Sequence, residues 1–202
     1  MLKNKIYLSV ICASVFLLNA CSSGIEETDF SKLTPEQRIE KISKISELKE
    51  NNKIALFSTK TNSRLAVNSV YHYKNKAFSL EFLGPMGMRY AKLDVLANGT
   101  TYLDVQGRNF NGDNARALLK EQFNLDIPVE KLPDIMFGIP DGKCSYDTHG
   151  YVNKATLSEG YEVAYKQYKT FKGGVVLPSD IEIIAPNNKV LIKVNSVTTL
   201  NY

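Results

Sequence analysis

The sequence predicts a mainly β-sheet fold with a few α-helices, on the strength of three observations. Apolar and polar residues alternate through most of the chain between residues 53 and 197, as they do in half-buried strands. About ten such stretches are joined by hairpin-length turns, so neighbouring strands are expected to be antiparallel. Three short segments carry apolar residues at helical spacing. A twisted sheet of this size curls, and its concave face is then filled by side chains, closed by helices or left as a cavity.

The N-terminal residues have the pattern of an export signal. Lys3 and Lys5 precede an apolar stretch over residues 6–18. This stretch of about 13 residues is shorter than the roughly 20 that a membrane-spanning helix needs, which makes a retained transmembrane anchor the weaker interpretation. We therefore predict that residues 1–20 are a signal peptide that is cleaved.

A cysteine follows this signal directly. The sequence Leu18-Asn19-Ala20-Cys21 resembles the lipobox of bacterial lipoproteins, and the resemblance implies that Cys21 becomes a lipidated N-terminus. Ser22, in place of an aspartate, resembles the pattern that sorts lipoproteins to the outer membrane. We expect residues 21–33 to form the lipidated N-terminus and a tether. Residues 34–202 are then one folded domain, held at the periplasmic face of the outer membrane through Cys21.

The folded domain is expected to begin with a helix. Thr34 suits the N-cap, Pro35 the first helical position and Gln37 the third, an arrangement that forms a capping box. The apolar residues that follow recur at every third position and predict a single stripe on a solvated helix. These residues are Ile39, Ile42, Ile45 and Leu48.

Strands are expected from residue 53 onward, where the helical period gives way to alternation. The first two strands are joined by a tight turn at Thr61-Asn62, and Asn98-Gly99 is a strong hairpin signal later in the chain. The strands expected in this half are 53–60, 63–73, 77–82, 89–95 and 100–106.

Two short helices and a second group of strands follow. An asparagine or aspartate of Asn111-Gly112-Asp113 is expected to cap a helix over 115–123. A helix over 130–137 has Pro133 in its first turn and ends before Gly138 and Pro140. Three such helices are too few and too short to fill the concave face, which leaves room for an apolar ligand. The remaining strands are expected over 145–149, 151–157, 161–171, 176–185 and 189–197, the last two turning at 186–188.

The composition argues against several other kinds of site. The formal net charge is +4, and no long basic block exists, so a nucleic-acid partner is not expected. The sequence contains neither a Walker-type phosphate loop nor a Gly-x-Ser-x-Gly elbow, so we predict no cofactor and no catalytic residues. His72 and His149 lack neighbours that ligate metals, so no metal site is expected.

Three features between residues 80 and 142 resemble the LolB family of outer-membrane lipoprotein receptors. The first is Leu83-Gly84-Pro85-Met86-Gly87, which resembles an apolar strand ending in a Pro-apolar-Gly loop. The second is the order and spacing of Asn98-Gly99 and the helix over 113–123. The third is Ile135-Met136-Phe137-Gly138-Ile139-Pro140, which resembles the family's helix ending in Gly-apolar-Pro. The similarity runs from about residue 37 to 197, although Tyr71 and Ile135 stand where the family often has tryptophan.

This resemblance implies both a fold and a function. The implied fold is an open (incomplete) antiparallel β-barrel of about ten to eleven strands with about three lid helices. The implied function is that of a receptor, not an enzyme. It would take acylated lipoproteins from a periplasmic carrier resembling LolA into a hydrophobic cavity and insert them into the outer membrane. We expect ten residues to line this acyl-chain cavity, the alternative being that they form a filled core: Phe78, Leu80, Phe82, Leu93, Val95, Leu103, Val105, Ile135, Met136 and Phe137.

The loop at Pro85, Met86 and Gly87 is the second site that the resemblance implies. Met86 matches the family's protruding apolar residue, so we expect the loop to enter the membrane and contact outer-membrane lipids. Pro85 would stiffen the loop and Gly87 would allow its turn. The alternative is a methionine folded back onto the core. The sequence also leaves open a non-enzymatic envelope scaffold or another lipid-binding lipoprotein on the same fold, and we expect a monomer.

Overall fold

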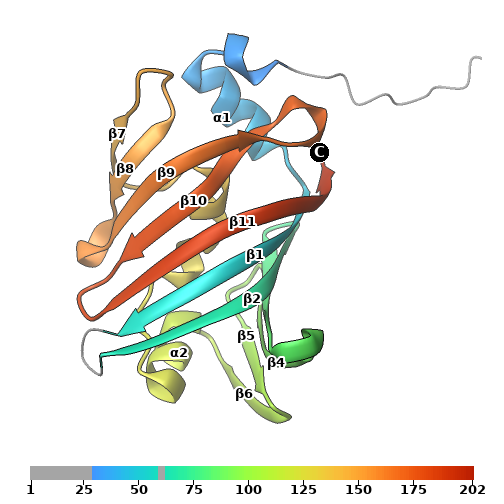
Figure 1. The fold of residues 1–202 in the computed structure, drawn as a ribbon, viewed down its shortest axis with the longest axis vertical. Coiled ribbons are helices and arrows are strands. Elements are labelled where there is room, and N and C mark those ends of the chain that lie inside the picture. Colours follow the sequence, from blue (N-terminus) through green and yellow to red (C-terminus); the bar gives the residue numbers. More distant parts are fainter. Residues whose placement is uncertain (1–28, 59–61) are drawn as a thin grey trace, which may run out of the picture.

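The computed structural model describes residues 29–58 and 62–202. The predicted signal peptide, Cys21, most of the tether and Thr61 lie outside these ranges. The described residues form one antiparallel sheet of eleven strands and three α-helices (Figure 1). The helices are α1 (Pro35–Ser43), α2 (Ala115–Phe123) and α3 (Leu132–Phe137). The strands are β1 (Glu47–Ser58), β2 (Ser63–Lys74), β3 (Ala77–Leu83), β4 (Arg89–Val95), β5 (Thr101–Val105), β6 (Arg108–Gly112), β7 (Lys143–Tyr146), β8 (Val152–Thr156), β9 (Glu162–Thr170), β10 (Val176–Ile184) and β11 (Asn188–Asn201).

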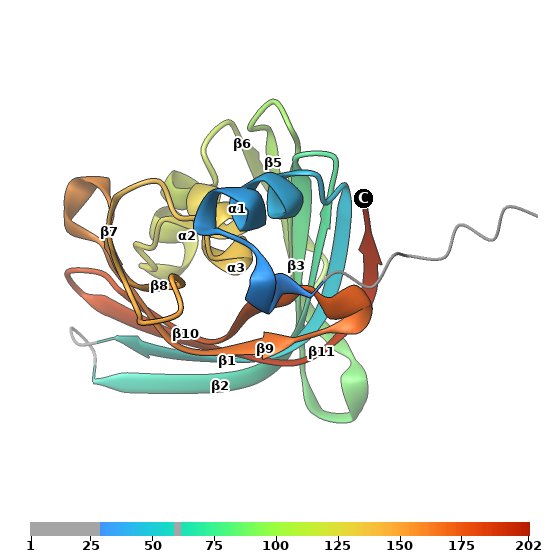
Figure 2. The ribbon, with the colours of Figure 1, turned by 90° about the horizontal axis from the view of Figure 1, so that it is seen from above.

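Two meanders make up the sheet, and the two longest strands hold them together. The strand order is β6-β5-β4-β3-β2-β1-β11-β10-β9-β8-β7, so β1 pairs with β2 on one side and with β11 on the other. Strands β6 and β7 are the two edges of the described sheet. The chain passes from one edge to the other through α2 and α3. Figure 2 shows the sheet curling around these helices. The prediction of an open antiparallel barrel with helices across its opening is confirmed.

The core lies between the concave face of the sheet and the helices. On β1 the buried residues alternate with more exposed ones, and Ile54 and Leu48 are among those turned inward. Helix α3 packs the buried Ile135 and Met136 against this face. Each large apolar side chain that is fully buried in this way contributes roughly 1.5–3 kcal/mol. Among the described residues, no helix is both long enough and apolar enough to cross a membrane.

Helix α1 begins as predicted but ends earlier. The capping box is present: the Gln37 amide donates to Thr34 Oγ1 at 3.3 Å, and the Thr34 amide donates to Gln37 Oε1 at 2.9 Å. The prediction that the apolar stripe lies on a single helix is wrong, because the helix ends at Ser43. Leu48 belongs to β1, where it lies opposite Tyr73 on β2 and Leu200 on β11. Pairing on both sides therefore outweighs the three-residue spacing.

Three further boundaries differ from the sequence prediction. Strand β6 was not expected, and it extends the first meander to Gly112. The cap of α2 is consequently Asn114, whose Oδ1 accepts from the Ala117 amide at 2.8 Å. Strand β7 ends at Tyr146 because the side chain of Asp147 closes a turn there, accepting from the amides of residues 149 and 151.

Helix α3 ends where the sequence predicted, at a glycine. Gly138 adopts φ 73°, and the Ile139 amide donates to the Asp134 carbonyl at 3.0 Å. A Cβ at this position would lie 2.9 Å from Pro178 Cγ on β10. The glycine is therefore needed both for the left-handed conformation and for close packing of α3 against the sheet.

Candidate functional site

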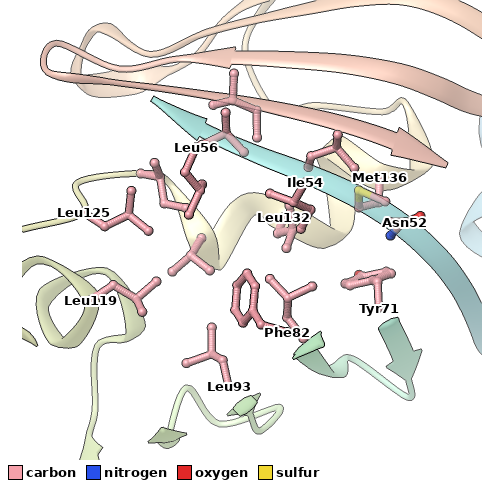
Figure 3. A pocket seen from close by; sticks show the side chains of 16 residues that line it. Asn52, Ile54, Leu56, Tyr71, Phe82, Leu93, Leu119, Leu125, Leu132 and Met136 are labelled. Atoms are coloured by element: carbon pink, nitrogen blue, oxygen red, sulfur yellow. The ribbon is translucent and has the colours of Figure 1, made fainter. Parts of the chain in front are cut away.

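A small apolar cavity lies between the concave face of the sheet and the helices. Its volume is about 40 Å³, which by volume holds about two or three water molecules. Figure 3 shows Asn52 and Tyr71 at one end of this deep cavity and Leu119 and Leu125 at the other. The lining residues are Asn52, Ile54, Leu56, Tyr71, Leu80, Phe82, Leu93, Leu119, Leu125, Ile127, Val129, Leu132, Met136, Ile183, Val190 and Ile192.

A larger hollow of about 320 Å³ continues from the deep cavity towards the end of the barrel where β1 and β2 meet. We call it the mouth cavity. Its further lining includes Leu65 and Val67 on β2 and Phe123 at the end of α2. Four side chains line both hollows and separate them: Leu56, Phe82, Leu119 and Leu125. The two hollows therefore adjoin each other, and we call them together the passage.

The ten residues predicted to line a cavity occupy three kinds of position. Leu80, Phe82, Leu93 and Met136 line the deep cavity, and Phe82 and Leu103 line the mouth cavity. Phe78, Val95 and Ile135 are buried in the core, and Val105 packs against it, but these four line neither hollow. Phe137 packs its ring edge against Tyr73, with ring centroids 5.0 Å apart.

Several lining residues were missed by the sequence analysis. Leu125 and Ile127 lie in the segment between α2 and α3, where nothing in the sequence shows which side chains turn inward. Ile54, Val190 and Ile192 lie on β1 and β11, whose alternation was visible in the sequence. Their place in the wall depends on the β1–β11 pairing, which joins strands from opposite ends of the chain.

The loop between β3 and β4 presents a fully exposed methionine. Met86 is 98% exposed and adopts the left-handed conformation, with φ 61°. The loop is closed by two backbone hydrogen bonds, in which the Gly84 amide donates to the Met88 carbonyl at 2.8 Å and the Gly87 amide to the Gly84 carbonyl at 3.2 Å. Phe82 and Tyr90, which lie on the strands just outside this loop, both line the mouth cavity. The loop that carries the methionine therefore connects two strands that both contribute a side chain to the mouth cavity.

The same turn occurs at two other places, which shows that its geometry does not require methionine. In the turn Ser158–Gly160 the tip is Glu159, with φ 64° and ψ 17°, compared with 61° and 17° at Met86. In the turn Lys172–Gly174 the tip is Gly173, with φ 77°. An exposed apolar side chain in a strained conformation thus occurs at the one of these three turns that flanks the mouth cavity.

A polar clamp holds the segment after α2 against the sheet. Asp126 accepts from Arg116 Nε at 2.6 Å and from the Tyr161 hydroxyl at 2.8 Å. The Arg116 guanidinium and, next, the Lys120 ammonium hold the pKa of Asp126 well below its usual range. Arg116 also pairs with Glu159. These contacts fix Asp126 beside the two residues, Leu125 and Ile127, that form part of the cavity wall.

Comparison with known proteins agrees with this architecture. The family model described as "Outer membrane lipoprotein LolB" matches residues 50–196. The outer-membrane lipoprotein LolB of Baumannia cicadellinicola subsp. Homalodisca coagulata is 26% identical over a 215-residue alignment, which covers 96% of this chain and 97% of that protein. The LolB of Pectobacterium carotovorum subsp. carotovorum (strain PC1) is 23% identical over 189 residues, covering 89% of this chain and 90% of the relative.

Among solved structures, a putative outer membrane lipoprotein-sorting protein domain from Vibrio parahaemolyticus has the same fold. The TM-score is 0.56 at 9% sequence identity, over 80% of this chain and 88% of that one. The matched residues 50–196 include most of the described sheet and the Met86 loop. The chain therefore belongs to the LolB family of outer-membrane lipoproteins.

Proposed function

We propose that this chain accepts acylated lipoproteins from a periplasmic carrier resembling LolA, shelters their acyl chains and inserts them into the outer membrane. The chain itself is held at the periplasmic face by lipid on Cys21. The observation that carries the proposal is a pair of adjoining apolar hollows, together with a fully exposed methionine in the loop between two strands that line the outer hollow. A non-enzymatic receptor needs both parts, one to hide hydrocarbon and one to lead it into the membrane.

The energetics of transfer require only a modest preference for this protein. An acyl chain gains about 0.8 kcal/mol for each methylene that leaves water, so free diffusion of a triacylated protein is excluded. A tenfold preference of the cargo for the receptor over the carrier needs about 1.4 kcal/mol. A few more buried methylenes on the receptor side supply this difference without a nucleotide.

Uptake requires the inner wall to move, since the deep cavity holds only about 40 Å³. The sheet is continuous along this wall, whereas Leu119 and Leu125 come from α2 and the segment after it. Helix α3 is the more deeply buried helix, with four of its six residues buried in the core and its Ile135 carbonyl accepting from the Tyr165 hydroxyl of β9 at 3.1 Å. We therefore assign the lid movement to α2 and residues 124–128, with the Asp126 clamp as its closure.

Release follows at the loop that carries Met86. A methionine that is 98% exposed loses little by entering the acyl region of a membrane and removes its apolar surface from water. Pro85 and the two hydrogen bonds of the loop keep the tip rigid, so insertion costs little conformational entropy. The mouth cavity is then placed at the membrane surface.

The test is transfer of a fluorescent triacylated lipoprotein from its soluble carrier to a soluble Cys21-less form, and from there to liposomes. The wild type is expected to complete both steps. Met86→Glu is expected to fold normally, because Glu159 already occupies the same conformation, and to take up cargo but deliver at least tenfold less. Met86→Leu is the matched apolar control and should deliver at the wild-type rate. Equal delivery by the glutamate and leucine variants would remove the loop from the mechanism, and no uptake by the wild type would refute the proposed function.

A further inference from the structure

Four polar side chains are buried on the concave face beside the deep cavity. Glu50 and Asn52 lie on β1, and Ser69 and Tyr71 lie on β2, with exposures of 0% or 1%. In the strand register Glu50 lies opposite Tyr71 and Asn52 lies opposite Ser69. Side chains alternate along a strand, so all four share the inner face with Ile54, the next inward residue of β1. We call these four residues the polar cluster.

The polar cluster is unusual because its side chains have no hydrogen-bond partner outside the cluster among the described residues; within it, Asn52 interacts with Glu50 and opposes the rise in the Glu50 pKa that burial causes. The lack of an outside partner holds for both carboxyl oxygens of Glu50, for the amide nitrogen and oxygen of Asn52, and for the hydroxyls of Ser69 and Tyr71. A buried polar group without a partner costs about 1–3 kcal/mol, and apolar residues at the same positions avoid that cost. A cavity that receives hydrocarbon alone gains nothing from these four side chains.

Two members of the cluster face into the deep cavity, and the cluster lies at a distortion of the sheet. Asn52 and Tyr71 line the deep cavity together, at the end opposite Leu119 and Leu125 (Figure 3). The β1–β11 register shifts twice at this level, between Lys49 and Glu50 and between Asn51 and Asn52. Such bulges re-aim side chains and are frequent next to binding sites.

The chemistry of the cluster selects for an uncharged ligand group that accepts hydrogen bonds. Burial raises the pKa of Glu50 to about 8, so its carboxyl is protonated at neutral pH and can donate. The hydroxyls of Ser69 and Tyr71 and the amide of Asn52 also donate. Among the described residues that line the deep cavity there is no lysine or arginine, so a phosphate or carboxylate would lack a counter-charge.

We propose that the polar cluster binds the ester and amide carbonyls through which a lipoprotein's acyl chains are attached. This inference rests on the proposed function and adds an orientation to it. The chain runs from the polar cluster past Ile54 and Leu56, so that its methyl end lies towards the mouth cavity and the Met86 loop. At the other end of the cluster, beyond Tyr73, lies a separate hollow of about 360 Å³ between α1 and α3, lined in part by Lys76, Glu130 and Asp134, and the polar remainder of the lipid would reach it only if the side chains between the two hollows move.

A matched pair of lipids isolates the carbonyl. 1-Palmitoylglycerol and 1-O-hexadecylglycerol have the same headgroup and the same chain length, but only the first carries an ester carbonyl. Displacement of a fluorescent fatty-acid probe from the soluble Cys21-less protein measures both affinities. We expect the wild type to bind the ester about tenfold more tightly, which corresponds to about 1.4 kcal/mol. Tyr71→Phe and Asn52→Leu should each reduce this preference, and the double variant should abolish it.

Controls separate this inference from folding and from the proposed function. Ile54→Val changes the apolar wall of the same cavity and should weaken both lipids equally. Tyr71→Phe removes only a hydroxyl that has no partner, so its urea midpoint should be at least that of the wild type. Equal wild-type affinity for the ester and the ether, or a preference that survives in the double variant, would overturn the inference and leave the proposed function standing. Binding of neither lipid would overturn both.

The source of the carbonyl is tested in a third arm. A dipalmitoylglyceryl-cysteine peptide and dipalmitoyl phosphatidylethanolamine carry the same two ester carbonyls. The peptide should displace the probe at the lower concentration. Displacement by the phospholipid at equal or lower concentration would overturn the assignment to lipoproteins.

Discussion

The free energy of unfolding is expected to depend on pH through the buried carboxyl of Glu50. In the folded protein burial raises the pKa of this carboxyl from 4.5 to about 8. Below pH 4.5 the carboxyl is protonated in both the folded and the unfolded chain, and no stability is lost. As pH rises above 4.5 the unfolded chain releases the proton and the folded chain does not, so stability falls by about 1.4 kcal/mol per pH unit. The loss ends near pH 8 and amounts to roughly 5 kcal/mol as an upper value.

The perturbation that isolates this effect is Glu50→Gln, which keeps the shape of the side chain and removes its titration. The free energy of unfolding, measured by urea denaturation at pH 5, 6, 7 and 8, should favour the variant by an amount that grows steadily with pH. Glu182→Gln is the control, because Lys189 lowers the pKa of Glu182 and its contribution to stability is lost at low pH instead. Its difference from the wild type should therefore stay constant from pH 5 to 8 and shrink only when the pH is lowered below about 4.5. If the difference in free energy of unfolding between Glu50→Gln and the wild type stays constant from pH 5 to 8, the conclusion that Glu50 is buried and protonated is wrong.

Three other substitutions test the lid, the cavity wall and the first helix. Asp126→Ala removes the acceptor of both the Arg116 guanidinium and the Tyr161 hydroxyl, of which the second joins the lid to the start of β9. The change should cost about 1 kcal/mol and speed hydrogen exchange over residues 124–128, and unchanged exchange there would show that the clamp does not hold the lid. Leu93→Ala should lower the free energy of unfolding by about 2–5 kcal/mol, because Leu93 is fully buried and lines the deep cavity. A loss below about 1 kcal/mol would mean that the cavity wall collapses to fill the space. Thr34→Ala removes the N-cap acceptor of the Gln37 amide and should cost about 1 kcal/mol, with faster exchange confined to α1; faster exchange across the sheet would contradict a local role.

The sheet was predictable from sequence wherever alternation and turn chemistry agree. The segment before Leu83 and the segment after Arg89 alternate cleanly, and both form strands close to the predicted bounds. Asn98-Gly99 forms the expected hairpin turn, with the Gly99 amide donating to the Leu96 carbonyl at 2.9 Å. Local signals suffice here because each strand pairs with its neighbour in sequence.

Prediction failed where long-range pairing overrides local pattern. The run Glu50-Asn51-Asn52 is polar and lies before the predicted start of the first strand at residue 53, yet it lies within β1. It is held as a strand by β2 on one side and by β11 on the other, and β11 begins more than 130 positions later in the sequence. The same pairing places Leu48 in β1, although the sequence predicted it in the first helix. A buried glutamate in that run could not have been predicted from composition.

The candidate site was predictable in kind rather than residue by residue. Met86 stands out in the sequence because an apolar residue sits between proline and glycine, and in the structure it is fully exposed in the loop between β3 and β4. The segment around Leu125 and Ile127 offers no period from which an inward direction can be read. The part of the cavity wall that this segment forms depends on how the chain passes through α2 and α3 from one edge of the sheet to the other.

The most direct measurement of the central claim is photolabelling by the cargo itself. A lipopeptide whose palmitoyl chains carry a diazirine on the terminal carbon is loaded from the carrier, irradiated, and the adducts are located by mass spectrometry. If the acyl chains lie in the passage with their methyl ends towards the mouth, we expect adducts on the four side chains that line both hollows: Leu56, Phe82, Leu119 and Leu125. Adducts confined to exposed outer residues such as Tyr102 and Tyr146, at saturating cargo, would contradict the account.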